Sequence, residues 1–191
     1  MSAQGAPRAR RLTEANQEAH FLLEDLYLDF MEALLEVDYE AAHLQLARLT
    51  GAIEAHAALE DVNAIPRFAH WLEGRTEAQA RTVSSLEGEI VVTEKTDLHL
   101  AGDHKILLRG LAAAARQLLA LTEKQAPRRQ LASVLEPFVR FQSVLEHHTV
   151  REQRFLYPVL DTILESEEAA ALADSLIATV KAGSKIEVPP S

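Results

Sequence analysis

The chain has 191 residues, of which 48% are hydrophobic, and it carries a formal net charge of −10 with no cysteine. This length suits one domain with a full core. The missing cysteine excludes disulfides, zinc–thiolate sites and iron–sulfur clusters, and the negative charge argues against sequence-independent binding to nucleic acid or an anionic membrane. No run approaches ~18 apolar residues, so no membrane span is expected and we predict a soluble cytoplasmic protein.

The composition predicts an all-α fold, because aromatic residues make up only 5% and glycine and proline number seven each. Residues 1–11 look like a flexible tail whose basic cluster is not followed by an apolar signal segment. A first helix is expected from about Thr13 to Val37. Asp38 can cap a second helix that runs from about Tyr39 to Asn63, which Pro66 should end or kink.

The next segment, 64–95, is the least regular and should hold a loop and a short helix. A third helix is expected from about Thr96 to Glu123, and Pro127 should open the fourth. That fourth helix runs from about Arg128 to Leu164, with Pro137 as an early kink.

A fifth helix follows at the C-terminal end. Ser166 can cap it, and it should continue to about Lys181 and be closed by Gly183. We therefore expect a bundle over residues 12–165, an additional helix and tail over 166–191, and a loose end from Ile186 to Ser191.

Apolar residues recur at alternating steps of three and four, which is the spacing of a bundle core. The inward faces of the four helices are, in chain order, His20, Leu23, Tyr27, Phe30 and Leu34; Leu46, Leu49, Ile53, His56, Glu60 and Asn63; Leu100, His104, Leu107, Leu111, Ala114, Leu118 and Leu121; and Val134, Phe138, Phe141, Leu145, His148, Glu152, Phe155 and Val159.

Six ionisable side chains interrupt these apolar faces. Ionisable groups are costly to bury without partners, so either the pattern fails there or the six groups bind something together. They are His20, His56, Glu60, His104, His148 and Glu152.

Their spacing forms a degenerate two-fold repeat. His56 and Glu60 are four residues apart, as are His148 and Glu152, so each pair shares one helix face. Pro66 and Pro158 follow at the same offset, ten residues after the histidine. The helix before each pair contributes one more inward histidine, which makes each half a His helix followed by a His-x-x-x-Glu helix.

The expected turns bring these groups level. In an antiparallel hairpin, residues equidistant from the turn lie at the same depth. The midpoint of His20 and His56 is residue 38, the predicted cap, and the midpoint of His104 and His148 is residue 126, beside Pro127. Both ligand layers would then lie roughly 27–33 Å from their turns at about 1.5 Å per residue.

Four imidazoles and two carboxylates that meet in a bundle core predict a dinuclear metal site. This donor set suits iron, with manganese or zinc as alternatives. The carboxylates can bridge two cations, while the imidazoles bind as neutral terminal ligands.

The motifs resemble those of the hemerythrin-like, or HHE cation-binding, family. The likeness covers about residues 12–165 and is carried by the segments around Ala-His56-Ala-Ala-Leu-Glu60, Gly-Asp-His104 and Leu-Glu-His-His148-Thr-Val-Arg-Glu152. The resemblance implies an antiparallel up-down four-helix bundle with a non-haem di-iron centre bridged by oxo or hydroxo.

The sequence differs from the oxygen-carrying members of that family. Those have a second histidine one turn after the third-helix ligand, where this chain has Leu108, and their last motif pairs His with Asp five residues later rather than with Glu four later. More coordination positions are then open, which favours reaction with hydrogen peroxide, oxygen or nitric oxide over reversible oxygen carriage. The alternative is an oxygen-, iron- or redox-sensing module without turnover.

Plainer interpretations apply to the other polar residues. His147 should point away from the seam, and His43, His70 and His99 should be surface or structural residues. Glu24, one turn after His20, is expected to be exposed rather than a ligand, and Tyr27 to be core rather than redox-active.

Overall fold

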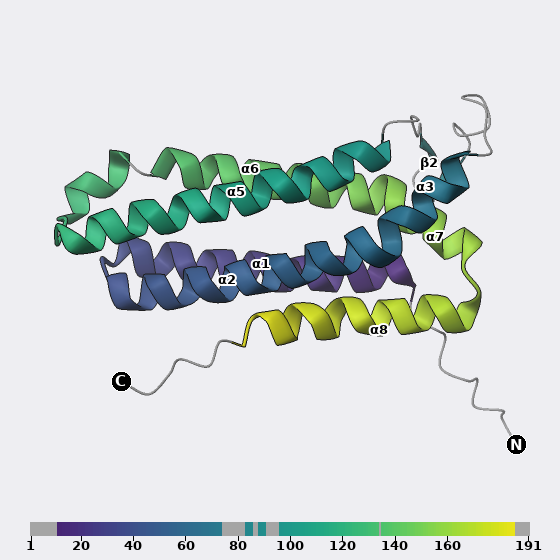
Figure 1. Cartoon of the computed structure of the whole chain (residues 1–191), viewed down its shortest axis with the longest axis horizontal. Coiled ribbons are helices and arrows are strands. Elements are labelled where there is room, and N and C mark those ends of the chain that lie inside the picture. The colour runs from purple at the N-terminus through teal and green to yellow at the C-terminus, as the bar shows by residue number, and fades with distance from the viewer. Residues whose placement is uncertain (1–10, 74–82, 86–87, 91–95, 134, 186–191) are drawn as a thin grey trace, which may run out of the picture.

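The computed structural model describes residues 11–73, 83–85, 88–90, 96–133 and 135–185. They form a helical bundle, as expected, in which long helices lie side by side along the longest axis (Figure 1). The long helices are α1 (Leu12–Leu35), α2 (Tyr39–Leu59), α5 (Thr96–Glu123), α6 (Leu135–Arg151) and α8 (Ser166–Gly183). Apart from Arg11, the predicted tails at 1–11 and 186–191 lie outside the described residues.

Shorter elements extend or connect these helices. Two π-helical turns, η1 (Glu60–Ala64) and η3 (Glu152–Leu156), join α2 to α3 (Ile65–Glu73) and α6 to α7 (Tyr157–Ile163). A 3₁₀ segment, η2 (Arg128–Ser133), precedes α6. The expected short helix after residue 64 is α3, and the region also holds an antiparallel pair that was not predicted, β1 (Val83–Ser85) with β2 (Gly88–Ile90).

The two turns between long helices close in the same way. Val37 after α1 and Gln125 after α5 both adopt positive φ, at 64° and 45°. The next amide in each turn, that of Asp38 or Ala126, donates back to the carbonyl five residues earlier at 3.0 Å, which satisfies an end carbonyl of the preceding helix. The side chain of Asp38 caps α2 by accepting from the amide of Ala41 at 3.0 Å, as predicted.

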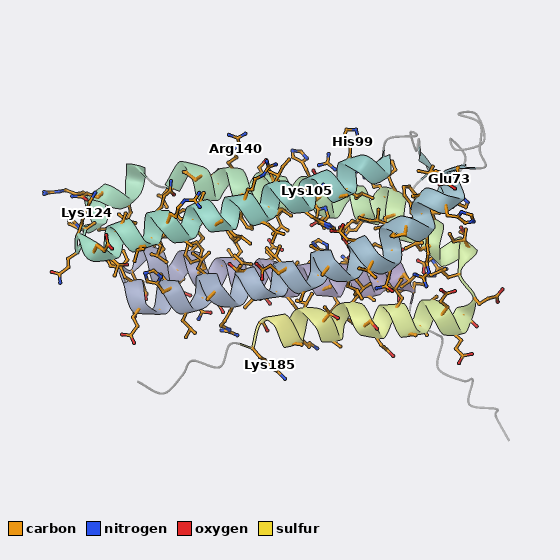
Figure 2. The ribbon with its side chains drawn as sticks, in the orientation of Figure 1. Glu73, His99, Lys105, Lys124, Arg140 and Lys185 are labelled. Carbon is orange, nitrogen blue, oxygen red and sulfur yellow. The ribbon has the colours of Figure 1, made fainter. Side chains whose placement is uncertain are left out.

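The predicted inward faces are largely buried. Every described residue of the first and third faces is buried, and so are those of the second and fourth except Asn63 and Phe155. Charged residues such as Lys105, Lys124 and Arg140 lie on the outside (Figure 2). Among the described helices, none combines the length and the apolar character needed to cross a membrane.

Asn63 and Phe155 were wrongly placed on the seam because each lies within a π turn, three residues after the glutamate that begins it. A π turn adds one residue to the helical repeat, so the inward positions after it move by one. Ala64 and Leu156 are therefore buried instead, while Asn63 and Phe155 are half-buried. Pro66 does not end the helical path, since the chain continues through η1 into α3.

Two predicted helix starts also differ from the structure. The fourth helix begins at Leu135 rather than Arg128, because residues 128–133 form a 3₁₀ segment. Pro137 then falls in the first turn of α6, where a missing amide costs no helical bond. Ser166 is the first residue of α8 rather than its cap, a position taken by Glu165 without a side-chain hydrogen bond.

The apolar core is divided by a polar layer. One cluster, which includes Leu23, Phe30 and Leu107, fills the bundle toward the two interhelical turns. The other, which includes Leu100 and Leu156, lies toward the opposite end. Along α2 with η1, α5, and α6 with η3, five of the ionisable residues fall between members of the two clusters, and His20 on α1 follows Ala19, the first residue of the first cluster. The groups that sequence analysis singled out therefore form one layer across the bundle.

Helix α8 packs along α1 and α2 at a point of very close backbone approach. A Cβ placed on Gly51 of α2 would lie 2.4 Å from the carbonyl oxygen of Gly183, and one on Gly183 would lie 2.4 Å from the carbonyl oxygen of Gly51. Gly183 therefore serves contact between helices, whereas the sequence suggested only a helix end.

We predict that Gly51→Ala destabilises the protein by about 1–3 kcal/mol, because a backbone oxygen must move to admit the methyl group. Gly102→Ala is the matched control in α5, where a Cβ meets nothing within 4 Å. The control should be neutral or stabilised by up to about 1 kcal/mol through helix propensity. Urea unfolding of both variants measures the difference, and equal stabilities would contradict the close packing of α8.

Candidate metal centre

The six ionisable side chains of the polar layer converge in the interior of the bundle. Glu60 and Glu152 are fully buried, and the four histidines, His20, His56, His104 and His148, are between 1% and 6% exposed. They come from α1, α2 with η1, α5, and α6 with η3. Four helices thus contribute to one site.

The histidines of each hairpin lie at one level. The ring centroids of His20 and His56 are 4.9 Å apart, and those of His104 and His148 are 4.7 Å apart. The equal depth expected from the turn positions is therefore confirmed. A contact between His20 and His148, at 5.8 Å, links the two hairpins.

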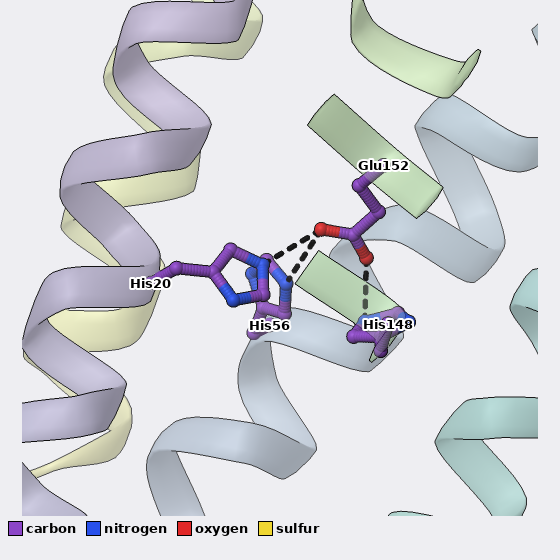
Figure 3. Close-up of side chains that lie close together, drawn as sticks. All are labelled: His20, His56, His148 and Glu152. Atoms are coloured by element: carbon purple, nitrogen blue, oxygen red, sulfur yellow. Dashed lines mark hydrogen bonds and ion pairs between the residues drawn. The ribbon is translucent and has the colours of Figure 1, made fainter. Parts of the chain in front are cut away.

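Glu152 lies between three of the histidines (Figure 3). Its Oε2 is 2.7 Å from Nε2 of His20 and 3.9 Å from Nε2 of His56. Its Oε1 is 2.5 Å from Nε2 of His148. One carboxylate therefore spans both hairpins, as a bridging ligand must.

Glu60 has a similar position toward the second hairpin. Its Oε2 lies 3.1 Å from Nε2 of His104 and 3.9 Å from Nε2 of His148, and its Oε1 lies 3.5 Å from Nε2 of His56. The hydroxyl of the buried Tyr157 donates a short hydrogen bond to Oε1. Glu60, like Glu152, contacts histidines of both hairpins.

These side chains make up two overlapping groups whose ligand atoms lie within 4.8 Å of one another and that could hold metal ions. The first group is His20, His56, His148 and Glu152, and the second is Glu60, His104, His148 and Glu152. Together the groups contain the six residues identified from the sequence. Neither Glu24 nor Tyr27 belongs to them; Tyr27 instead donates to the carbonyl of Phe138 at 3.2 Å.

Outer hydrogen bonds orient two of the imidazoles. The hydroxyl of Thr149 donates to the carbonyl of Leu145, so at 2.7 Å it can only accept from Nδ1 of His20. Nδ1 of His104 lies 2.8 Å from a carboxylate oxygen of Asp61. Both contacts place a proton on Nδ1, and in the neutral ring Nε2 then carries the lone pair that faces the cluster.

Further polar side chains lie next to His148 and Glu152. Nδ1 of His148 lies 3.8 Å from Asp103, which binds Arg151 at 2.7 Å. The amide of Asn16 donates to Oε2 of Glu152 at 3.2 Å. The hydrogen bond from Asn16 helps to hold Glu152, whereas Asp103 lies near His148 beyond hydrogen-bond distance.

The electrostatics of the cluster are strongly perturbed. Burial and the charge of Glu152 raise the pKa of Glu60 to about 8. Burial also acts to raise the pKa of Glu152, but His148 and His20 outweigh it and hold that pKa well below its ordinary value. Burial, together with the other imidazoles, lowers the pKa of His56 well below its ordinary value, so this ring is neutral at physiological pH.

His56 provides the test of whether a cation fits. Both of its ring nitrogens are buried without a hydrogen-bond partner among the described residues, although Nε2 faces Glu60 and Glu152. A buried neutral imidazole with neither nitrogen paired costs about 1–3 kcal/mol per group. A metal ion between Nε2 and the two carboxylates would use the lone pair and neutralise the acids, so this donor set fits a cation.

A π turn begins at the cluster glutamate in each half of the chain. The amides of Ile65 and Tyr157 donate to the carbonyls of Glu60 and Glu152, five residues back. The prolines at 66 and 158, six residues after each glutamate, lack the amide for an ordinary helical bond. Wide turns of this kind are common at functional sites, and here the repeated proline offset in the sequence marks both.

Several residues that support the site were not predicted from the sequence. Tyr157 had a signal, since it directly precedes the repeated proline and follows Glu152 by five residues. Asp61 and Thr149 had none, because they are adjacent in sequence to other polar residues and only the packing shows their contacts. His147 is exposed, as expected, and so are His70 and His99; His43 contacts Thr122 at 3.0 Å.

Comparison of the chain with protein-family models, with curated proteins and with solved structures gave no match.

We predict that Tyr157→Phe destabilises the protein by about 2–3 kcal/mol, because it leaves an oxygen of the buried Glu60 without its donor. Tyr27→Phe is the matched control, since it removes a hydroxyl that donates to a neutral backbone carbonyl and should cost about 1 kcal/mol. Thermal unfolding of both variants measures this. A smaller loss in Tyr157→Phe than in Tyr27→Phe would contradict the pairing with Glu60.

Proposed function

We propose that this chain is a hemerythrin-like protein, an antiparallel up-down four-helix bundle that binds two iron ions and reacts with small oxidants. The observation that carries the proposal is the pair of overlapping four-residue groups in one buried layer. Support also comes from the two-fold repeat of His-x-x-x-Glu, π turn and proline, because it provides equivalent ligands from each half of the chain.

The ligands divide between the two halves. We assign His20 and His56 to one ion and His104 and His148 to the other, since these pairs are adjacent in space. Glu60 and Glu152 each face histidines of both hairpins, which suits carboxylates that bridge two cations. Imidazole with carboxylate favours iron, and manganese or zinc are the alternatives.

The protein supplies orientation and a dry environment. When bound, the two irons would supply redox change and Lewis acidity for peroxide, oxygen or nitric oxide. Thr149 and Asp61 hold His20 and His104 with Nε2 inward. Tyr157 keeps a proton on its phenol oxygen, because burial and the nearby Glu60 raise its pKa, and this hydroxyl fixes the orientation of Glu60.

The leucine at position 108 favours reaction with small oxidants over reversible oxygen carriage. In the oxygen-carrying pattern this position holds a further histidine, whereas here the leucine is half-buried against the apolar cluster. Six protein ligands leave more coordination positions for water or substrate than seven. A sensing or oxygen-binding module without turnover is the alternative, and measurement of hydrogen peroxide decomposition and nitric oxide consumption by iron-loaded protein distinguishes the two.

Protein purified without chelators should carry about two irons per chain, because two overlapping ligand groups share one layer. It should also absorb in the near ultraviolet, as bridged ferric pairs do. Elemental analysis together with absorption spectroscopy checks this. One tightly bound zinc with no iron would refute the di-iron assignment.

Glu60→Ala and Glu152→Ala should each reduce retained metal to one ion or fewer per chain, because each carboxylate contacts both halves of the site. His147→Ala is the control, since its side chain is exposed beside His148 and should leave metal content unchanged. Metal content after extensive dialysis measures the effect. Full loading of both glutamate variants would show that the carboxylates do not bridge.

A further inference from the structure

A cleft lies between α1 and the α6–η3 segment, on the side of the bundle where His20 is placed. Its volume is about 210 Å³. The described residues that line it are Gln17, His20, Phe21, Glu24, Tyr27, Gln142, Leu145, Glu146, Thr149, Val150 and Gln153. This cleft plays no part in the ligand assignment above.

The cleft reaches the metal centre at one point. Of the six cluster residues, His20 alone lines it, and His20 is also the most exposed of them, at 6%. Thr149, which orients His20, lies beside it on the cleft wall. The imidazole of His20 therefore lies between a molecule in the cleft and the space enclosed by the six cluster residues.

The size and lining of the cleft limit what it can take. Sites for organic ligands usually occupy about 300–1,000 Å³, whereas a molecule the size of water takes roughly 30 Å³. Phe21, Leu145 and Val150 contribute apolar walls. At about 210 Å³ the cleft is smaller than most sites for organic ligands, yet it has room for several molecules of diatomic size, so it admits small ligands such as diatomic gases.

The charge of the lining residues further restricts which small molecules can enter the cleft. The carboxylates of Glu24 and Glu146 line the cleft, and its described residues include no lysine or arginine. Burial and the charge of Glu146 raise the pKa of Tyr27, so its phenol is neutral as well. The negative potential of the two acids disfavours small anions and does not act on uncharged molecules.

We infer that the α1–α6 cleft is the route by which small uncharged molecules, such as nitric oxide or dioxygen, reach the site beside His20, and that Glu24 and Glu146 exclude anions from it. The inference rests on the proposed function in one respect, namely that an entering molecule reaches a metal ion beside His20. The route itself is a property of the cleft.

The absence of cysteine allows the cleft to be blocked selectively. Val150→Cys places a single thiol at the cleft, where the native side chain is 43% exposed, and a bulky maleimide attached there should close it. Val139→Cys is the matched control, a valine on the same helix that is 60% exposed and about 16 Å away at 1.5 Å per residue.

Nitric oxide association with the reduced, iron-loaded protein should slow by roughly ten-fold or more after labelling at position 150, because association is limited by access. Iron content and the final spectrum should not change. Labelling at position 139 should leave the rate unaltered. An unchanged rate in the labelled position-150 variant, with full iron, would overturn the route.

The charge component has its own test. Glu24→Gln combined with Glu146→Gln should raise the rate of azide association several-fold at low ionic strength and leave nitric oxide association unchanged. An equal change for both ligands, or none for azide, would overturn the selection against anions.

A measurement on metal-free protein separates this inference from the metal assignment. Dissolved paramagnetic dioxygen should enhance nuclear relaxation more at the methyl groups of Leu145, which lines the cleft, than at those of Leu26, which does not. Both leucines are 7% exposed, so solvent access alone predicts equal effects. If the protein and its variants bind no iron, the proposed function fails, but this comparison still tests the route through the cleft. Equal enhancement at Leu145 and Leu26 would refute the route.

Discussion

The bundle depends on how it tolerates six ionisable side chains in its interior. Two carboxylates and four imidazoles replace what would otherwise be one apolar layer, and desolvation of such groups is costly unless they are paired. Histidine–carboxylate contacts satisfy part of this cost, but His56 has neither nitrogen paired among the described residues. The layer could therefore hold metal ions, and apolar clusters lie on both sides of it along the bundle.

The repeat of the chain gives this layer its geometry. Two hairpins with the same turn closure bring one histidine from each helix to the same depth. A π turn then starts at each glutamate, at a fixed distance from a proline that cannot continue an ordinary helix. The same local chemistry, used twice, yields two carboxylates that each face both halves. This arrangement is what makes a dinuclear centre a stronger proposal than two separate ions.

The outer shell of the site is less symmetric than the ligands. His20 is oriented by Thr149, a neutral hydroxyl at a cleft, whereas His104 is oriented by the carboxylate of Asp61. A carboxylate partner makes an imidazole a stronger donor than a hydroxyl does. The two ions of the proposed centre would therefore differ in environment, and the ion beside His20 would be the one nearer to the cleft.

The sequence alone determined the helical class, the inward faces, the two turn positions and the six buried ionisable residues. Those features follow from local periodicity and from spacing about a turn, which act within one or two helices. The shared offset of the two prolines was visible in the sequence, but at Pro66 it led to the expectation of a helix end or kink rather than of a π turn. Asn63 and Phe155 were placed on the seam for the same reason, since the extra residue in each turn only becomes apparent once the backbone is built.

Tertiary structure decided what depends on contacts between distant segments. The hydroxyl of Tyr157 meets Glu60 across 97 positions of sequence, and the hydroxyl of Thr149 meets His20 across 129. The close approach of α8 at Gly51 and the cleft beside His20 likewise require helices from different parts of the chain. No local pattern encodes such contacts, because only the packing of the helices brings the partners together.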